Sequence, residues 1–481
     1  MAVDYNLVII GNTAAGIEAA ITAARLKARV ALVEQRLEGS DRLEMMTQST
    51  LVEAGRRTVE LQRARELGIG KIGDVNQTTI EAQWQRLQSW LEVVKATTEL
   101  TNSAAELAAL GVDVIPGRGE FCRKPSPGFV VNGRFLNANA YLIAAHHRPL
   151  IPDIPGLSDA GYLTPTTIAQ RLPELQQLNQ LVVVGGSPVA IEVTQALVRL
   201  GLHLTLIVDS DQILPGIEPQ AAAWLQASLE AEGVNVLTRT KVTQIRQIQG
   251  KKWLQAGNHG IETDEILLAV GQQPELDNLN LAAVSIQRSA TGLVVNPQQR
   301  TSHPKIYACT GQREQHWCPN QAIHEARVAL KNALFLPVFT AERLTIPFVV
   351  NADPELATIG LTESAAIQRY GKDVMILQQS FNALPKAQIQ GDLVGFCQLI
   401  GHRNGRILGA HLVGSQASEL IGTIALAMQQ KLPIPALAQL NLPSLTRSEI
   451  LSQTVSQWHD LRLKQRPRLQ DLLEAWFQFR R

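Results

Sequence analysis

One stretch near the N-terminus, Leu7–Gln35, combines an apolar strand, a glycine turn, a helix of small residues and a second apolar strand that ends at Glu34. In such a unit, Gly11 permits the tight turn and Gly16 lets the helix lie close to the strand. The helix N-terminus offers N–H groups to a pyrophosphate, and Glu34 can accept hydrogen bonds from ribose hydroxyls. Thr13 replaces the second glycine, and its Cβ narrows the approach to the backbone. The unit predicts a dinucleotide site. The alternative is a Rossmann-like unit that contributes to packing and binds no ligand.

A second unit of the same kind begins at the apolar strand Leu181–Val184, continues through a helix to Leu200, and returns in the strand Leu202–Val208. Its turn and first helical residues are Gly185, Gly186, Ser187, Pro188, Val189 and Ala190. Two such units in one chain imply two dinucleotides bound face to face; the alternative for the second is a copy of the fold with an empty site. Asp209 follows the returning strand, and no arginine stands close behind it. An acid there favours a free ribose hydroxyl, so NADH is expected in preference to NADPH.

Composition excludes several classes of protein. The 481 residues are 45% apolar, so the chain can bury several cores and form two to four domains. The 44 basic and 43 acidic residues give a net charge of +1, which offers no footprint for nucleic acid. No apolar run reaches the length of a membrane span, and the first strand starts too early for a secretory signal. We therefore expect a soluble, cytoplasmic protein.

Between the two units, Arg36–Leu67 predicts a polar loop followed by a long helix, and Thr78–Leu110 predicts one or two more helices. Asn132-Gly133 in the sequence FVVNGRFL predicts a two-residue hairpin turn. The following segment, His146–Gly156, contains several prolines and predicts a linker without regular structure.

Seven segments in fixed order then carry a family resemblance. They read DYNLVIIGNTAAG, IAAHHRPLIPDIPG, VVVGGSPVAIE, AVGQQP, TSHPKIYACTGQ, FVVNADPELATIGLTE and GRILGAHLVGSQASELI. Over nearly its whole length the chain resembles the flavoprotein disulfide reductases, the group of dihydrolipoamide dehydrogenase, glutathione reductase and mercuric reductase. The resemblance implies an α/β homodimer with two Rossmann-like dinucleotide-binding domains and a C-terminal α+β dimerisation domain.

The resemblance also implies domain limits and cofactor residues. The limits are 1–150 for the first part of the FAD-type domain, 151–270 for the NAD(P)-type domain, 271–340 for the second part of the FAD-type domain, 341–457 for the dimerisation domain and 458–481 for a tail. The residues expected at FAD or NAD(P) are Gly11, Thr13, Ala14, Ala15, Gly16, Glu34, Gln35, Ala145, Gly185, Ser187, Pro188, Val189, Asp209, Gly271, Gly311 and Gln312.

The positions that carry the family's thiol chemistry differ in this chain. Asp41 and Met46 occupy the positions of the two active-site cysteines, and Thr50 that of the nearby lysine. Near the C-terminus, Leu442 and Arg447 stand where the family has its catalytic histidine and the glutamate that orients it. None of these side chains forms a disulfide or moves a proton to sulfur. Disulfide reduction is therefore not expected.

Retention of FAD depends on two further positions and on one helix residue. The family's aspartate near the ribityl chain is replaced by Gly311, or by Gln312 if one residue is inserted, and His146 replaces a glycine near the cofactor. Glu192 matches a helix glutamate whose lysine partner is Thr50 here, so it is a protonated or solvated carboxylate or a proton donor to flavin. We expect FAD, with a plugged, cofactor-free fold as the alternative.

Two further features were weighed. Cys309, His316, Cys318 and His324 lie close in sequence, but their spacing matches no standard metal site, so no metal is expected. The tail is basic and amphipathic, and it either packs on the dimer or contacts a membrane surface or a protein.

Two functions follow. One is an NAD(P)H-dependent flavin oxidoreductase that passes electrons to a small-molecule or protein acceptor without thiols; the other is a scaffold that has lost catalysis.

Overall fold

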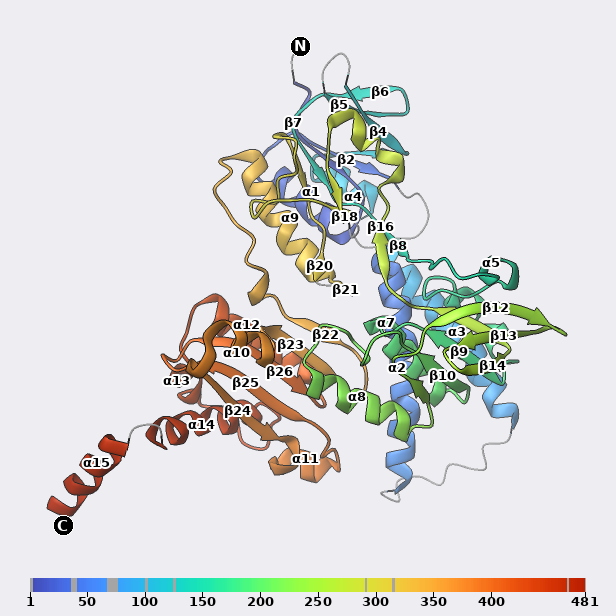
Figure 1. The fold of residues 1–481 in the computed structure, drawn as a ribbon. Coiled ribbons are helices and arrows are strands. Elements are labelled where there is room, and N and C mark those ends of the chain that lie inside the picture. The colour runs from blue at the N-terminus through green and yellow to red at the C-terminus, as the bar shows by residue number, and fades with distance from the viewer. Residues whose placement is uncertain are drawn as a thin grey trace. The chain divides into compact units, whose positions relative to one another are not determined.

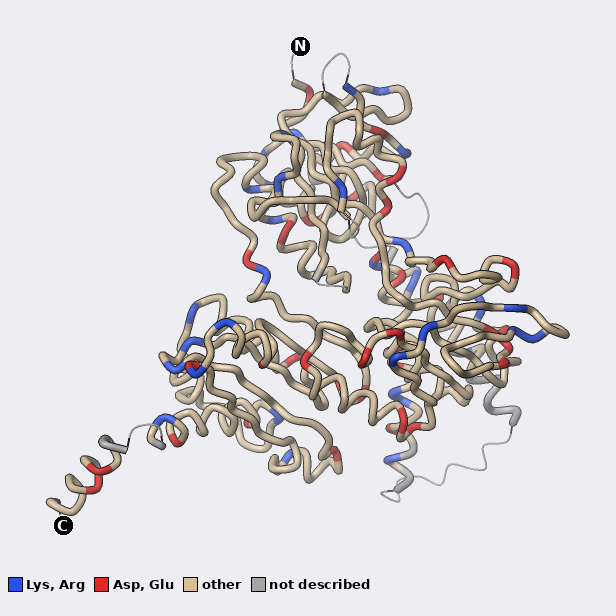
Figure 2. Tube along the Cα trace, viewed as in Figure 1, with Lys and Arg blue, Asp and Glu red and all other residues tan. Residues whose placement is uncertain are grey.

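The computed structural model describes residues 3–35, 41–66, 77–99, 103–123, 127–289, 292–313, 316–464 and 467–480. The chain divides into two compact units (Figure 1). The first contains Met1–Gly216 and Glu232–Glu342, and the second contains Ile217–Ala231 and Arg343–Arg481. Helix α8 (Pro219–Ala231), which the sequence analysis included in the NAD(P)-type domain, therefore belongs to the second unit. Lysine and arginine alternate with aspartate and glutamate along both units in Figure 2.

The first nucleotide-type domain is built on a parallel sheet. Its strands, in spatial order, are β19 (Ile306–Ala308), β7 (Ala138–Ile143), β1 (Tyr5–Ile10), β2 (Val30–Glu34) and β3 (Val112–Pro116). Helices α1 (Ala14–Arg25) and α9 (Pro319–Leu334) pack together on this sheet. Because both faces of the central strands are covered, these strands are continuous apolar runs.

The second nucleotide-type domain repeats this plan. Its parallel strands, in spatial order, are β11 (Asn235–Leu237), β10 (His203–Ile207), β9 (Gln180–Val184) and β15 (Glu265–Leu268). Helix α7 (Pro188–Arg199) follows β9, and an antiparallel sheet is added by β12 (Val242–Ile248), β13 (Lys251–Ala256) and β14 (His259–Thr263). The two Rossmann-like domains expected from the sequence are thus present.

Helix α2 (Asp41–Glu66) follows β2 in the chain but lies beside α7 of the second domain (Figure 1). At Gly55 the two helices approach so closely that an added Cβ would lie 3.0 Å from the Cα of Ala196. Helices α3 (Gln77–Glu99) and α4 (Ala104–Ala109) follow α2. The long helix predicted within Arg36–Leu67 is therefore α2, which begins at Asp41 in the described part of the chain.

The predicted hairpin is confirmed. Strands β5 (Gly128–Val131) and β6 (Arg134–Leu136) are joined by Asn132 and Gly133, whose φ angles of 50° and 75° suit a type I′ turn. They extend β4 (Gly119–Cys122) into an antiparallel sheet.

The expectation that the proline-rich linker lacks regular structure was wrong in part. His147–Pro149 forms strand β8, which pairs antiparallel with β16 (Gln272–Pro274). Proline ends each of these two strands, and a terminal position tolerates its missing N–H.

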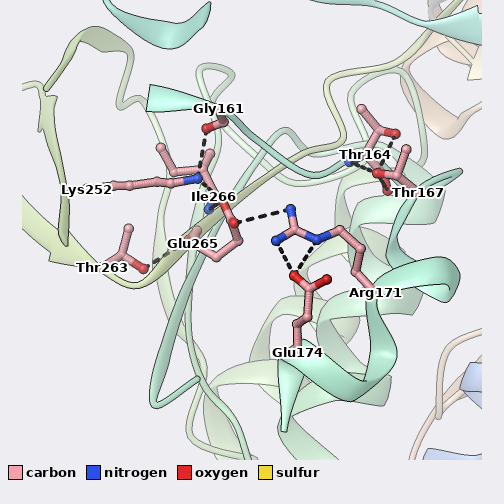
Figure 3. Close-up of polar contacts among 9 residues, drawn as sticks. All are labelled: Gly161, Thr164, Thr167, Arg171, Glu174, Lys252, Thr263, Glu265 and Ile266. Carbon is pink, nitrogen blue, oxygen red and sulfur yellow. Dashed lines mark hydrogen bonds and ion pairs between the residues drawn. The ribbon is translucent and has the colours of Figure 1, made fainter. Parts of the chain in front are cut away.

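A buried ion pair joins the added sheet to the parallel sheet of the second domain (Figure 3). The ammonium of Lys252 on β13 contacts the carboxylate of Glu265 on β15 and donates a hydrogen bond of 2.9 Å to the carbonyl oxygen of Gly161. The guanidinium of Arg171 lies 3.7 Å from the same carboxylate. Since Lys252 and Glu265 are both buried, Lys252 depends on Glu265 for its charge partner, and Lys252 is the nearer of the two cations beside Glu265.

Replacing Lys252 with methionine is expected to lower the free energy of unfolding by about 3–5 kcal/mol, because Glu265 would stay buried without its main partner. The adjacent Lys251→Met is the matched control, since Lys251 pairs with Asp264 at the surface and is 48% exposed. Urea unfolding at one protomer concentration compares the two. Equal stability of the two variants would contradict the prediction.

The second unit is built on an antiparallel sheet. Its strands, in spatial order, are β22 (Phe348–Val350), β23 (Leu356–Gly360), β26 (Ile407–Val413), β25 (Phe396–His402) and β24 (Val374–Ser380). Its helices after α8 are α10 (Glu363–Tyr370), α11 (Pro385–Gln390), α12 (Ala417–Gln429), α13 (Ile434–Ala438), α14 (Glu449–Lys464) and α15 (Pro467–Phe479). Trp458, which the sequence analysis placed at the start of the tail, is fully buried in this core. None of the helices in the described ranges is both long and apolar enough to span a bilayer.

Candidate functional site

The first glycine turn has the form that the sequence predicts. Gly11 adopts a φ of 114°, and a Cβ there would lie 2.0 Å from the carbonyl oxygen of Ala144. The Thr13 hydroxyl accepts a hydrogen bond from Gly16 N–H and donates one to the same Ala144 oxygen. Thr13 is therefore the N-cap of α1, and it joins the helix start to the end of β7.

At the end of β2, Glu34 and Gln35 have different surroundings. Partial burial raises the pKa of the Glu34 carboxyl above its ordinary value. The Gln35 amide pairs with the backbone N–H and carbonyl of Gly119 at 3.4 and 3.5 Å. Glu34 thus keeps the position expected of a ribose acceptor, whereas Gln35 braces the neighbouring strand.

His146 forms a buried bridge across the crevice between the two ends of this site. Its Nδ1 lies 2.8 Å from Oδ1 of Asp41, and its Nε2 lies 2.6 Å from Oδ1 of Asn12. Asn12 comes from the glycine turn and Asp41 is the first residue of α2. The His146 side chain is only 1% exposed. The bridge therefore ties together the turn, α2 and the segment after β7.

Two small cavities lined by described residues lie beside the bridge. One, of about 10 Å³, is lined by Thr13, Asp41 and His147 among others, and holds roughly one water. The other, of about 30 Å³, is lined by Gln35, His146 and Glu275 among others. Ala145 lines both cavities, so the bridge lies between them. Pockets for organic ligands usually start at about 300 Å³. Neither of these two cavities reaches that volume, so FAD does not fit into either one as it stands.

His147 and Trp317 lie at the smaller cavity with their rings 4.9 Å apart. Both ring nitrogens of His147 and the indole nitrogen of Trp317 are buried without a hydrogen-bond partner. Burial lowers the pKa of His147 to about 4, so the ring is neutral at neutral pH. These three unsatisfied atoms are the part of the crevice that still suits a polar ligand.

In the segment where the family's aspartate was expected, backbone N–H groups donate hydrogen bonds to a side chain of the same domain. Gly311 has a φ of 60°, and a Cβ there would lie 2.9 Å from the Cβ of Ala322. Glu325 on α9 is fully buried and accepts hydrogen bonds from the N–H groups of Thr310 and Gly311 at 2.8 and 2.9 Å. Gln312 is held in the short strand β20 (Gln312–Arg313), where its carbonyl accepts from Gln321. Sequence reasoning missed Glu325, because its partners lie fourteen and fifteen residues away.

The second glycine turn leads into an open groove. Gly185 has a φ of 126°, and the Ser187 hydroxyl accepts from Ala190 N–H and donates to the carbonyl oxygen of Ala269, 2.6 Å away. This geometry repeats that of Thr13. The groove beside the turn has a volume of about 800 Å³ and is lined by Gly185, Gly186, Asp209, Lys241 and Val270 among others. Of the expected nucleotide residues, Gly271 adjoins this lining and its carbonyl accepts a hydrogen bond from Leu150.

Gly185→Ala is expected to destabilise the protein clearly more than Gly201→Ala and to weaken nucleotide binding. Both glycines have φ between 100° and 130°, so each substitution carries a backbone cost of about 1–2 kcal/mol. Only at position 185 would the new Cβ meet other atoms, with Ala269 O 2.4 Å away. Thermal unfolding and nucleotide titration compare the variants, and similar losses in both would contradict the prediction.

Comparison with known proteins identifies the family to which this chain is similar. A family described as pyridine nucleotide-disulphide oxidoreductase matches residues 5–333, and the dimerisation domain of the same family matches residues 346–455. The chain belongs to this family. Family members depend on FAD and NAD(P)H, and the dimerisation domain indicates a homodimer.

Relatives within the family align over most of the chain. Mercuric reductase of Staphylococcus aureus is 28% identical over 93% of this chain and 81% of its own length. Dihydrolipoyl dehydrogenase of Thermus scotoductus is 30% identical over 95% and 97%. The crystal structure of LpdA from Mycobacterium tuberculosis shares the fold with a TM-score of 0.82 at 24% identity, covering 94% of this chain and 99% of that one.

The residues expected at the family's thiol positions take part in other contacts. Asp41 takes part in the His146 bridge, and the Thr50 hydroxyl donates to the carbonyl oxygen of Met46 at 2.7 Å. Glu192 is buried on α7. None of the four cysteines, Cys122, Cys309, Cys318 and Cys397, forms a disulfide in the described structure. Burial raises the pKa of Cys309 and Cys397 far above that of an ordinary thiol, which disfavours the reactive thiolate.

Arg447, expected at the position of the family glutamate, takes part in packing instead. Arg447 is buried and donates hydrogen bonds to Asp392 at 2.7 Å and to Gln390 at 2.9 Å. Leu442 packs against the hydrophobic core of the same unit.

Members of the cluster Cys309, His316, Cys318 and His324, where no metal site was expected, make other contacts. His316 Nε2 lies 2.9 Å from the carbonyl oxygen of Pro215, and Cys318 Sγ contacts Asn320. Within the described ranges, no group of three metal-ligating side chains comes together.

Proposed function

We propose that the protein is a pyridine-nucleotide-binding homodimer that neither reduces disulfides nor holds FAD in its resting form. The observation that carries this proposal is the buried bridge from Asn12 through His146 to Asp41, which divides the FAD-type crevice. The open groove beside Gly185 supports retention of nucleotide binding in the second domain. Of the two functions weighed from the sequence, this is the scaffold.

We propose the loss of thiol chemistry because the side chains at the expected positions cannot perform it. Asp41 and Met46 cannot form a disulfide, and Leu442 cannot act as an acid or base. Arg447 is held by Asp392, so it is committed to packing.

A second candidate is the flavin oxidoreductase that uses NAD(P)H and a non-thiol acceptor. It is favoured by the half-buried carboxylate of Glu34 and by the unsatisfied nitrogens of His147 and Trp317, which a cofactor could satisfy. For this candidate the bridge must open before the cofactor enters.

An absorbance spectrum of the full-length protein separates the two functions. We expect a colourless protein as isolated, no flavin band after incubation with FAD and desalting, and no turnover of oxidised glutathione or lipoamide. NADH or NADPH is expected to bind nonetheless, measured by quenching of tryptophan fluorescence. A yellow protein whose flavin band is bleached by either nucleotide would establish the second candidate instead.

The segment at the C-terminus is proposed to pack within the homodimer rather than on a membrane or another protein. Leu472, Trp476, Phe477 and Phe479 on α15 are 52–84% exposed in the single chain. Burial of these side chains against a second copy would remove a large apolar surface from water.

A further inference from the structure

The two nucleotide-type domains can be superposed residue by residue through their strand registers. In the first, Ile10 pairs with Val33, and Gly11 N–H donates to Val33 O at 2.9 Å. In the second, Val184 pairs with Ile207, and Gly185 N–H donates to Ile207 O at 2.8 Å. The residue after Val33 is Glu34, and the residue after Ile207 is Val208. Val208 therefore occupies the ribose-facing position, and Asp209 lies one residue beyond it.

This register changes the electrostatics expected at the second site. A carboxylate at the end of this strand binds the ribose hydroxyls and repels a 2′-phosphate. Val208 carries no charge, and its backbone N–H and carbonyl are already bonded to Leu237 and Thr240 at 2.8 and 3.0 Å. Asp209 is exposed, so the high dielectric constant of water weakens its repulsion without removing it.

Positive charge reaches the same place from a segment that is distant in sequence. Arg239 N–H donates to Ser210 O at 2.9 Å and Thr240 N–H to Val208 O, which fixes this segment beside the end of β10. Lys241 follows directly and lines the groove together with Asp209. Among the described residues lining the groove, Lys241 is the only lysine or arginine, and no described acid pairs with it.

Arg239 provides a second cation next to the groove. Its Nε lies 2.9 Å from Asp211, but both side chains are more than 70% exposed. An ion pair in water is weak, so a phosphate dianion can replace Asp211 as the partner of Arg239.

We infer that this groove accepts a 2′-phosphorylated adenine nucleotide, such as NADPH, at least as well as NADH, with Lys241 and Arg239 as the residues that determine this specificity. The inference rests on the proposed nucleotide binding. It departs from the expectation of NADH, which assumed that Asp209 dominates the ribose end.

Titration of the full-length protein with NADPH and with NADH, followed by tryptophan fluorescence, tests the inference. We expect NADPH to bind with equal or smaller Kd, and Lys241→Gln to weaken NADPH about tenfold while changing NADH by less than about twofold. Arg239→Gln should weaken NADPH selectively, and Asp209→Asn should strengthen it. Arg246→Gln, an exposed cation on β12, is the matched control and should change neither nucleotide.

Three outcomes would overturn the inference. NADH binding without NADPH binding overturns it alone, as does an unchanged ratio of the two Kd values in both Lys241→Gln and Arg239→Gln. Failure of both nucleotides to bind overturns the proposed function as well. If one variant fails to fold, the other and Asp209→Asn still decide the question, because each acts on the same ratio.

Discussion

His146→Gly is expected to convert a colourless protein into one that binds FAD and turns yellow. Removing the imidazole breaks both contacts of the bridge, to Asn12 and to Asp41, and joins the cavities on either side. We expect FAD affinity to rise at least about tenfold, or about 1.4 kcal/mol. Equilibrium dialysis with FAD, followed by an absorbance spectrum, measures the change.

Stability provides a second readout for the same variant. Without FAD, His146→Gly should lose about 1–3 kcal/mol, because the buried Asp41 carboxylate loses a hydrogen-bond partner. FAD at 100 times its Kd should restore about 2.7 kcal/mol. His259→Gly, at an exposed position of β14, serves as the control and should not respond to FAD. A folded His146→Gly protein that stays colourless in excess FAD would show that the crevice is closed for another reason.

Arg447→Met is expected to destabilise the second unit by about 3–5 kcal/mol, because Asp392 would remain buried as an unpaired charge. The double variant Arg447→Met with Asp392→Leu removes both charges and should recover most of the loss. Urea unfolding at fixed protomer concentration gives the free energies, since dissociation of a dimer also contributes.

Arg403→Met is the matched control for that experiment. Arg403 pairs with Asp373 at the surface and is 68% exposed, so its loss should cost no more than about 1 kcal/mol. If the double variant were as unstable as Arg447→Met, the loss would come from packing of the arginine stem rather than from the charge of Asp392.

The parts of the fold that were predicted correctly depend on local sequence patterns. Glycine turns at Gly11 and Gly185 and the Asn132-Gly133 hairpin each require a positive φ that few residues adopt. Apolar runs between them identify buried parallel strands, because both faces of such strands are covered.

The parts that could not be predicted depend on partners that are distant in sequence. His146 meets Asp41 and Asn12 across 105 and 134 residues. Arg447 pairs with Asp392, which is 55 residues away in the sequence. Arg239 lies near the end of β10 only because β11, which precedes Arg239 in the chain, pairs with β10. The sequence placed His146 where the family resemblance implies a glycine near the cofactor, but it contained no local sign of what the imidazole ring would bind.

The N-cap hydroxyl groups of α1 and α7 affect how strongly each helix N-terminus can bind the diphosphate of a nucleotide. At α7, Ser187 already occupies the amide of Ala190, and Pro188 has no amide hydrogen to offer. Fewer main-chain donors in this first turn therefore point outward than in a helix that starts with glycines. A visiting coenzyme must gain most of its binding free energy from the adenosine half, and the diphosphate mainly sets the direction in which the rest of the molecule extends.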